Sequence, residues 1–219
     1  GGIVGSTGSG KGTRVQLSQR VYTATSGHVR LSGVDVNDIE RHHLRRSVGL
    51  VLQEPFLYSR TIGENIAIAR PGAAMDDITA AARTASVHDV IESFEHGYST
   101  VVGERGVTLS GGQKQRGAIA RTLLQAAPIL IFDDALSAVD AETDAAIRDA
   151  LCARAGGTML LISHRIATVR RADLILVMDG GRIVQMGTNK TLCREAGMYR
   201  RVCELQAELD EAVPQEGGR

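Results

Sequence analysis

Glycines, residues with hydroxyl side chains and a lysine occur at close spacing near the start of the chain, in the segment Gly5-Ser6-Thr7-Gly8-Ser9-Gly10-Lys11-Gly12-Thr13. Glycines allow successive backbone N–H groups to turn toward one anion, and a lysine adds a positive charge beside them. The apolar residues Ile3 and Val4 precede the segment and read as the end of a strand, while residues 13–17 read as a helix. This order predicts a phosphate-binding loop, and a flexible glycine turn is the alternative.

The residue after the lysine departs from the usual pattern of such loops. A serine or threonine normally stands there, and its hydroxyl ligates Mg²⁺. In this chain the position is Gly12, followed by Thr13. One step along a helix turns a side chain by about 100°, so Thr13 is not expected to fill the same coordination place. We therefore expect phosphate binding together with altered Mg²⁺ coordination.

The composition is that of an ordinary globular protein, with 43% hydrophobic and 23% charged residues. Lysine plus arginine and aspartate plus glutamate balance at 25 each, so no excess of positive charge favours binding to nucleic acid. No apolar run approaches the ~20 residues that span a bilayer. The widely spaced Cys152, Cys193 and Cys203 are expected to be reduced thiols. Because the chain begins almost at the predicted loop, we expect it to be part of a longer polypeptide.

Apolar runs alternate with helical patterns along the rest of the chain, which predicts an α/β fold with a mainly parallel sheet. Strands are expected at residues 28–31, 33–36, 48–52, 128–132, 158–162, 174–178 and 183–184. Residues 73–125 read as helical, interrupted by a glycine-rich loop at residues 103–112. Asp140 reads as the N-cap of a further helix. Two helices are expected before Pro214, with a disordered tail after it.

Polar side chains directly follow several of the predicted strands. Gln53 follows one strand, Asp133 and Asp134 another, and His164 a third. Ligands of parallel α/β sheets bind at the carboxyl ends of the strands, so these residues are expected to converge with the glycine loop on one phosphate site. For His164 the alternative is a helix-capping or surface histidine without a role in binding.

These residues resemble the motifs of ABC transporter nucleotide-binding domains, and the resemblance covers nearly the whole chain. The most specific element is Leu109-Ser110-Gly111-Gly112-Gln113, which matches the family signature without a change. The other motifs resemble a Walker A loop at residues 5–11, a Q-loop at Gln53, Walker B at residues 129–133, a D-loop at residues 137–140 and an H-loop at His164. Residues 61–66 and 103–106 resemble the exporter type, in which transmembrane helices precede this domain in the same chain.

The resemblance implies a P-loop NTPase core at residues 1–72 and 126–219, with a helical subdomain at residues 73–125. It implies ATP and Mg²⁺ as cofactors, with Asp133 and Gln53 at the metal and Asp134, His164 and Gln53 in catalysis. Nucleotide contacts would come from residues 5–13, Gln53, residues 110–113, Asp140 and His164. The family's N-terminal strands and adenine-stacking aromatic are absent, so no residue here is assigned to the base.

A second departure lies at Asp134, where the family places a glutamate that polarises the attacking water. Aspartate is one methylene shorter, and a displacement of about 1 Å can cost ~10²-fold in rate. The alternative is that Asp134 still works through a small backbone shift or a bridging water. In this family two domains form each site head to tail, one giving the Walker motifs and the other the signature. The chain thus resembles the degenerate-site half of a heterodimeric exporter.

The leading functional prediction is an ATPase that drives export from the cytoplasmic face of a membrane, with slow turnover at its own site. Its expected partners are a second nucleotide-binding domain and a transmembrane domain, and no nucleic acid. One alternative is a regulatory module that binds nucleotide without hydrolysing it. Another is a soluble ABC-type ATPase acting on DNA or ribosomes, which the balanced charge and the lack of a long coiled-coil insertion disfavour.

Overall fold

The computed structural model describes residues 1–5, 9, 11–103, 106–137, 139–152 and 157–212. The chain divides into two compact units, Gly1–Val15 with Leu160–Arg219, and Gln16–Met159. We call them the first and the second unit and describe each by itself. The boundaries between them fall within helix α1 (Lys11–Ser18) and within strand β6 (Thr158–Ser163), most of which belongs to the first unit. No helix among the described residues is long and apolar enough to cross a membrane.

The first unit is built around a parallel strand triplet. Strand β1 pairs in parallel with both β6 and β7, and β7 pairs antiparallel with β8. All four residues of β1 are buried, as expected for a strand with neighbours on both sides. The elements of this unit are β1 (Gly2–Gly5), β6 (Thr158–Ser163), α8 (Ile166–Val169), β7 (Ile175–Asp179), β8 (Arg182–Gly187), α9 (Asn189–Leu192) and α10 (Met198–Ala212).

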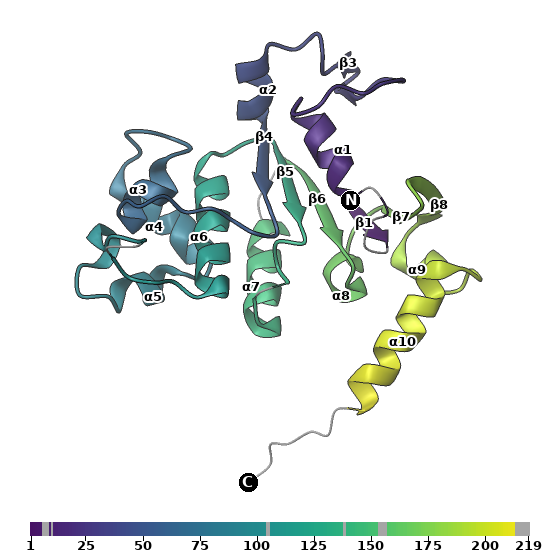
Figure 1. Ribbon diagram of the computed structural model, residues 1–219. Coiled ribbons are helices and arrows are strands. Elements are labelled where there is room, and N and C mark those ends of the chain that lie inside the picture. The colour runs from purple at the N-terminus through teal and green to yellow at the C-terminus, as the bar shows by residue number, and fades with distance from the viewer. Residues whose placement is uncertain (6–8, 10, 104–105, 138, 153–156, 213–219) are drawn as a thin grey trace. The chain divides into compact units, whose positions relative to one another are not determined.

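The second unit combines a parallel strand pair, β4 and β5, with a group of helices (Figure 1). Helix α6 packs on α3, α4 and β4, and α4 also packs on α3 and α5. The elements are β2 (Arg30–Leu31), β3 (Val34–Asp35), α2 (Arg41–Ser47), β4 (Val48–Val51), α3 (Ile62–Ala67), α4 (Met75–Thr84), α5 (His88–Glu92), the 3-10 helix η1 (Gly97–Ser99), α6 (Gly111–Leu124), β5 (Ile129–Asp133) and α7 (Ala141–Cys152).

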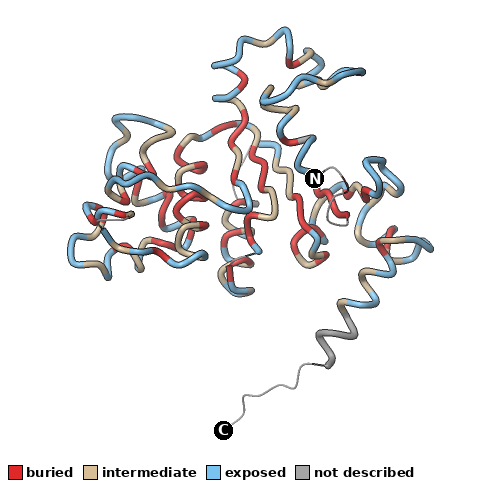
Figure 2. The backbone as a smooth tube through the Cα atoms, in the orientation of Figure 1, coloured by how far each residue is buried: buried red, intermediate tan, exposed pale blue. Residues whose placement is uncertain are grey.

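The core of the second unit follows the apolar runs of the sequence. Figure 2 shows the buried backbone running along β4, β5 and the inner sides of α6 and α7. Ile119 and Ile147 are 0% exposed and Phe132 is 1% exposed. Gly49 in β4 lets α6 approach closely, since a Cβ there would lie 2.8 Å from Thr122 Cγ2 and 2.9 Å from Leu130 Cδ2. Packing against the strands therefore holds the helix that begins at the signature segment.

The observed elements confirm the predicted α/β class with mainly parallel strands. One boundary was wrong, because the glycine-rich loop predicted at residues 103–112 ends at Ser110 and the pair Gly111-Gly112 forms the first turn of α6. The Ser110 cap compensates the unpaired N–H groups of that turn, which lets two glycines begin a helix. Helices α2, α3 and α8 were not predicted, and the predicted disordered tail lies outside the described residues.

Candidate nucleotide-binding site

The phosphate-loop lysine bends back toward the start of its own loop. Lys11 Nζ donates to the Gly5 carbonyl oxygen at 2.7 Å and to Ser9 Oγ at 3.3 Å, and Ser9 is 2% exposed. Residues 6–8 and 10 of the predicted loop lie outside the described residues. The ammonium group therefore lies beside the end of β1. Lys11 is the first residue of α1, and the N-terminus of a helix favours an anion.

Gly5 is required by the packing of the first unit itself. A Cβ at this position would collide with the carbonyl oxygen of Met178 on β7 and would lie 2.7 Å from Ser9 Oγ. Only glycine allows the strand to end this close to its neighbour and turn at once into the loop.

The two residues after the lysine are exposed in the first turn of α1. Gly12 brings no side chain there, and Thr13 is the next residue along the helix. The described residues contain no group of three or more His, Cys, Asp or Glu side chains that could hold a metal ion. Magnesium bound together with a nucleotide commonly takes only one or two protein carboxylates, so this finding does not test the predicted ligands Asp133 and Gln53.

Strand register brings the polar residues of each unit together at a strand edge. In the first unit Val4 pairs with Ser163, so Gly5 and His164 leave neighbouring parallel strands side by side. In the second unit Val51 pairs with Phe132, so the Gln53 segment and Asp133 do the same. Each of these pairs lies at the carboxyl ends of its own strands, where α/β sheets bind ligands.

The residue after Asp133 has an unusual backbone. Asp134 has a φ of 48°, which is uncommon for a residue other than glycine. The backbone N–H and the hydroxyl of Ser137 both donate to the Asp134 carbonyl oxygen, at 3.2 and 2.8 Å. This tight turn holds the backbone of Asp134 directly after β5.

The signature pentapeptide forms a capping box at the start of α6. Ser110 Oγ accepts from the Gln113 N–H at 3.2 Å, and Gln113 Oε1 accepts from the Ser110 N–H at 2.9 Å. Both side chains therefore satisfy helix-terminal groups within this chain. Ser110 and Gly111 are exposed, and no described atom would lie within 4 Å of a Cβ at Gly111. The helix start presents open space at that glycine.

Asp140 is the N-cap of α7, as predicted, and also faces the signature helix. Its Oδ1 accepts from the Thr143 N–H at 2.9 Å, and this backbone hydrogen bond is the main reason that the pKa of Asp140 is lowered. Its Oδ2 lies 3.9 Å from an Arg116 guanidinium nitrogen on α6. The D-loop aspartate and the signature helix are thereby in electrostatic contact within the second unit.

Two side chains of α6 that were not predicted hold the segment around Gln53. Gln115 is 1% exposed and its Nε2 donates to the Leu52 carbonyl at 3.0 Å. Arg121 donates to the Asn65 carbonyl at 2.8 Å, to Asn65 Oδ1 at 3.2 Å and to the Phe56 carbonyl at 3.0 Å. Burial lowers the pKa of the Arg121 guanidinium. No local pattern marks these residues, because their partners lie 56–65 residues away.

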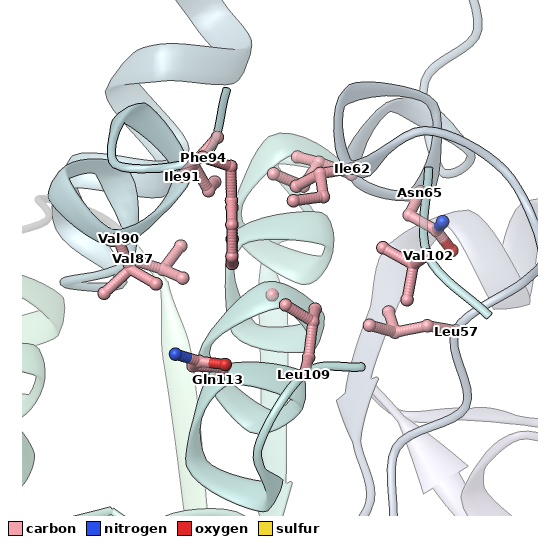
Figure 3. A pocket seen from close by; sticks show the side chains of 12 residues that line it. Leu57, Ile62, Asn65, Val87, Val90, Ile91, Phe94, Val102, Leu109 and Gln113 are labelled. Atoms are coloured by element: carbon pink, nitrogen blue, oxygen red, sulfur yellow. The ribbon is translucent and has the colours of Figure 1, made fainter. Parts of the chain in front are cut away.

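An apolar cavity lies beside the capped end of α6 (Figure 3). Leu109, which precedes the cap, reaches into it together with Ile62 of α3 and Phe94 beyond α5. Leu109 is 7% exposed and Ile62 is 5% exposed. The first residue of the signature therefore anchors the pentapeptide in the helical group, while the next two residues face outward.

The family of the chain follows from comparison with known proteins. Residues 1–137 match the family model described as ABC transporter. The chain belongs to the ABC transporter family. It is 48% identical over 213 residues to the Beta-(1-->2)glucan export ATP-binding/permease protein NdvA of Rhizobium meliloti, covering 96% of this chain and 36% of that protein. It is 45% identical over 205 residues to the putative multidrug export ATP-binding/permease protein YgaD of Bacillus subtilis, covering 93% and 35%.

A solved structure of a bacterial Atm1-family ABC exporter with ATP bound superimposes on this ABC domain with a TM-score of 0.91 and 42% identity, covering 94% of this chain and 36% of that one. The domain is thus of the exporter type and has the P-loop NTPase fold with a helical subdomain, as predicted. It spans roughly a third of the length of these relatives.

Proposed function

We propose that the chain is the ATP-hydrolysing domain of an exporter on the cytoplasmic face of a membrane. The strand register carries this proposal, because it places Gly5 beside His164 in one unit and Gln53 beside Asp133 in the other. Phosphoryl transfer to water depends on positioning and on charge stabilisation, which these residue types supply. The relatives are export proteins of several kinds, so the transported substrate is not assigned.

The proposal gives each of these residues a role. Lys11 and the loop from Gly5 to Thr13 would hold the phosphates of ATP. Asp133, with Gln53, would hold Mg²⁺, which neutralises phosphate charge when bound. Asp134 would orient the attacking water, and His164 would contact the terminal phosphate. We propose that the chain consists of an ATPase core at residues 1–72 and 126–219 and a helical subdomain at residues 73–125.

We further propose that this domain works with a second, different nucleotide-binding domain. Gly12 lacks the metal-ligating hydroxyl, and Asp134 is shorter than the usual glutamate. The signature is complete, and the open space at Gly111 leaves room for a nucleotide held by the partner. A homodimer would repeat the weak Walker half-site twice, as two-fold symmetry requires. Most ATP hydrolysis would then occur at the site that this chain completes through its signature residues and Asp140. The signature residues are Ser110, Gly111, Gly112 and Gln113.

A transmembrane partner would dock on the second unit near the Gln53 segment. Phe56 is 68% exposed, Tyr58 is 46% exposed, and their rings meet edge to face at 4.9 Å. Val101, which forms a β-bridge with Thr61, is 44% exposed. Exposed apolar groups held in fixed positions are typical of a protein contact surface, and Arg121 fixes this one through the Phe56 carbonyl.

The decisive experiment compares two variants in the full-length, membrane-reconstituted transporter. Ser110→Asn keeps a good N-cap residue but replaces the hydroxyl offered to the partner's nucleotide, so we expect steady-state ATPase activity to fall more than about tenfold. Asp134→Asn affects only the slow site and is expected to cost less than about twofold. If Asp134→Asn lowers ATPase activity as much as Ser110→Asn does, most hydrolysis occurs at this chain's own site and the heterodimer proposal fails.

The same two departures favour one other function, a module that binds nucleotide without turnover. In that case both variants would leave the ATPase activity of the assembled transporter unchanged. Calorimetric titration would still detect ATP binding that depends on Lys11. Preserved activity in Ser110→Asn together with loss of activity in Asp134→Asn would instead point to an autonomous site.

A further inference from the structure

Two cysteine side chains meet at the end of α9 in the first unit. Cys193 directly follows α9 and Cys203 lies in α10, and their Sγ atoms are 3.1 Å apart. Both are free thiols of intermediate exposure. Neither residue belongs to the phosphate loop, the H-loop or any other segment that the proposed function uses.

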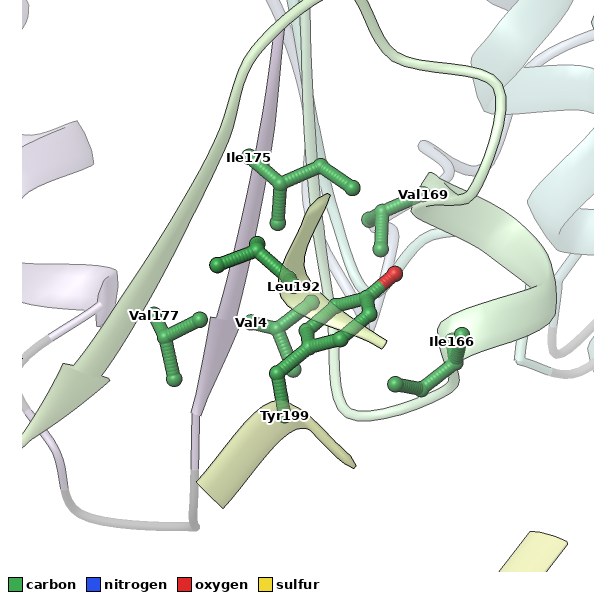
Figure 4. Close-up of a cluster of buried hydrophobic side chains, with 7 residues drawn as sticks. All are labelled: Val4, Ile166, Val169, Ile175, Val177, Leu192 and Tyr199. Atoms are coloured by element: carbon green, nitrogen blue, oxygen red, sulfur yellow. The ribbon is translucent and has the colours of Figure 1, made fainter. Parts of the chain in front are cut away.

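The thiol pair lies on the face of α10 that packs onto the unit. Tyr199, Cys203 and Gln206 follow the spacing of one helix face. Tyr199 is 0% exposed and lies among Val4, Ile166 and Leu192 (Figure 4). Its hydroxyl donates to Asn189 Oδ1 at 2.8 Å, which ties α10 to α9 beside the two sulfurs.

The same helix face reaches the segment that follows His164. Gln206 Oε1 accepts from the Ile166 N–H at 3.1 Å, and Ile166 is the first residue of α8. Gln206 is thus a polar cap for the helix that follows the H-loop. The position of α10 therefore bears on the backbone directly after His164.

We propose that Cys193 and Cys203 form a site of reversible oxidation, at which a disulfide fastens α10 to the end of α9 and steadies the His164 segment through Gln206. The oxidant is a peroxide, and a small thiol reductant reverses the reaction. The link to His164 as a functional residue rests on the proposed function, whereas the thiol chemistry does not.

The chemistry assigns different roles to the two sulfurs. Burial, reinforced by the neighbouring Cys193, raises the pKa of the Cys203 thiol to about 12, so Cys203 stays protonated at neutral pH. The sulfur of Cys193 therefore attacks the peroxide and becomes a sulfenic acid, and its proton leaves with the departing hydroxide as one water. The Cys203 sulfur then displaces that oxygen. The two thiols and one hydrogen peroxide give one disulfide and two waters, the peroxide being reduced by two electrons.

The test uses the full-length protein, treated with hydrogen peroxide and then digested without reductant. Trypsin cleaves after Lys190, Arg194 and Arg201, so a disulfide would link residues 191–194 to residues 202–219. We expect this linked peptide to appear on oxidation and to disappear with dithiothreitol. Cys193→Ala and Cys203→Ala should each abolish it, and Cys152→Ala, the matched control, should leave it unchanged. Separate sulfinic acids without a linked peptide would overturn the proposal.

Hydrogen exchange tests whether the disulfide stabilises the segment after His164, which thiol reactivity alone does not show. The amide of Ile166 should exchange more slowly in the oxidised protein than in the reduced protein, because its acceptor Gln206 is then held more firmly. Gln206→Ala should remove that difference while still forming the linked peptide. Equal exchange at Ile166 in both redox states would overturn the connection to the His164 segment. Neither readout requires ATP turnover.

Discussion

The phosphate loop and the signature segment are both glycine-rich stretches that lead into a helix, yet their glycines have different reasons to be there. Gly5 is enforced from within, since a side chain would collide with the Met178 carbonyl on the neighbouring strand. A Cβ at Gly111 would meet no described atom within 4 Å, and the capping box beside it is made by Ser110 and Gln113 without a side chain at Gly111. The packing of this chain explains the first glycine, whereas no contact within the described residues requires the second.

Gly5→Ala should give the largest change in stability. The added methyl group faces a backbone carbonyl that cannot rotate away, so we expect a loss of about 3 kcal/mol in the free energy of unfolding. Urea denaturation of the full-length protein in detergent, followed through the ATP-binding domain, measures it. A loss below ~1 kcal/mol would show that β1 and β7 adjust easily and would weaken the contrast with Gly111.

Arg121→Ala tests how firmly the signature helix is held. Removing the guanidinium leaves the Asn65 and Phe56 carbonyls without this donor, for an expected cost of about 2 kcal/mol. Arg121→Lys keeps the charge but not the planar fork, and should recover less than half of that loss. Thermal unfolding under identical conditions gives both values, and a fully stable Arg121→Ala variant would contradict the anchoring role.

Two substitutions of Ser110 distinguish its role as a helix cap from its proposed role toward the nucleotide. Ser110→Ala removes the cap and is expected to cost about 1 kcal/mol, whereas Ser110→Asn keeps a side-chain acceptor and should be nearly neutral in stability. Thermal unfolding measures both changes. If the two variants are equally destabilised, the hydroxyl has a structural role beyond the capping box.

Gly12→Ser restores a hydroxyl after the phosphate-loop lysine. We expect Mg²⁺ to enhance ATP binding by roughly tenfold more than in the native protein, equivalent to ~1.4 kcal/mol from one added ligand. The helix start itself should gain less than ~1 kcal/mol. Calorimetric titration with and without Mg²⁺ separates the two effects, and an unchanged Mg²⁺ dependence counts against the missing ligand.

Gly111→Ala should have the smallest effect on stability and a large effect on turnover. Its methyl group enters open space, so the free energy of unfolding should change by less than ~0.5 kcal/mol. In the assembled transporter the same methyl group would obstruct the partner's nucleotide and lower ATPase activity. Normal turnover in this variant would mean that nothing approaches Gly111, and the contrast between the two glycine segments would lose its functional meaning.

Features that depend on nearby residues were predictable. The apolar runs predicted β4, β5, β6 and β7, and a helix was predicted where α1 lies. The phosphate loop predicted before α1 falls largely on residues 6–8 and 10, outside the described residues. The spacing Ser110-x-x-Gln113 also carries a helix-start signal, which the loop assignment at residues 103–112 overlooked. Helix α3 was missed because its single capped turn and a half is too short for a clear period.

The sequence by itself determined the family, the motif order and the two departures at Gly12 and Asp134, because residue identity and spacing along the chain carry that information. Only the tertiary structure decided that Arg121 holds the Phe56 segment, that Gln206 caps α8, and that the sulfurs of Cys193 and Cys203 meet. These contacts join residues from different helices and loops. Which side chains meet there depends on how the elements pack, and packing is a collective property that no local spacing encodes.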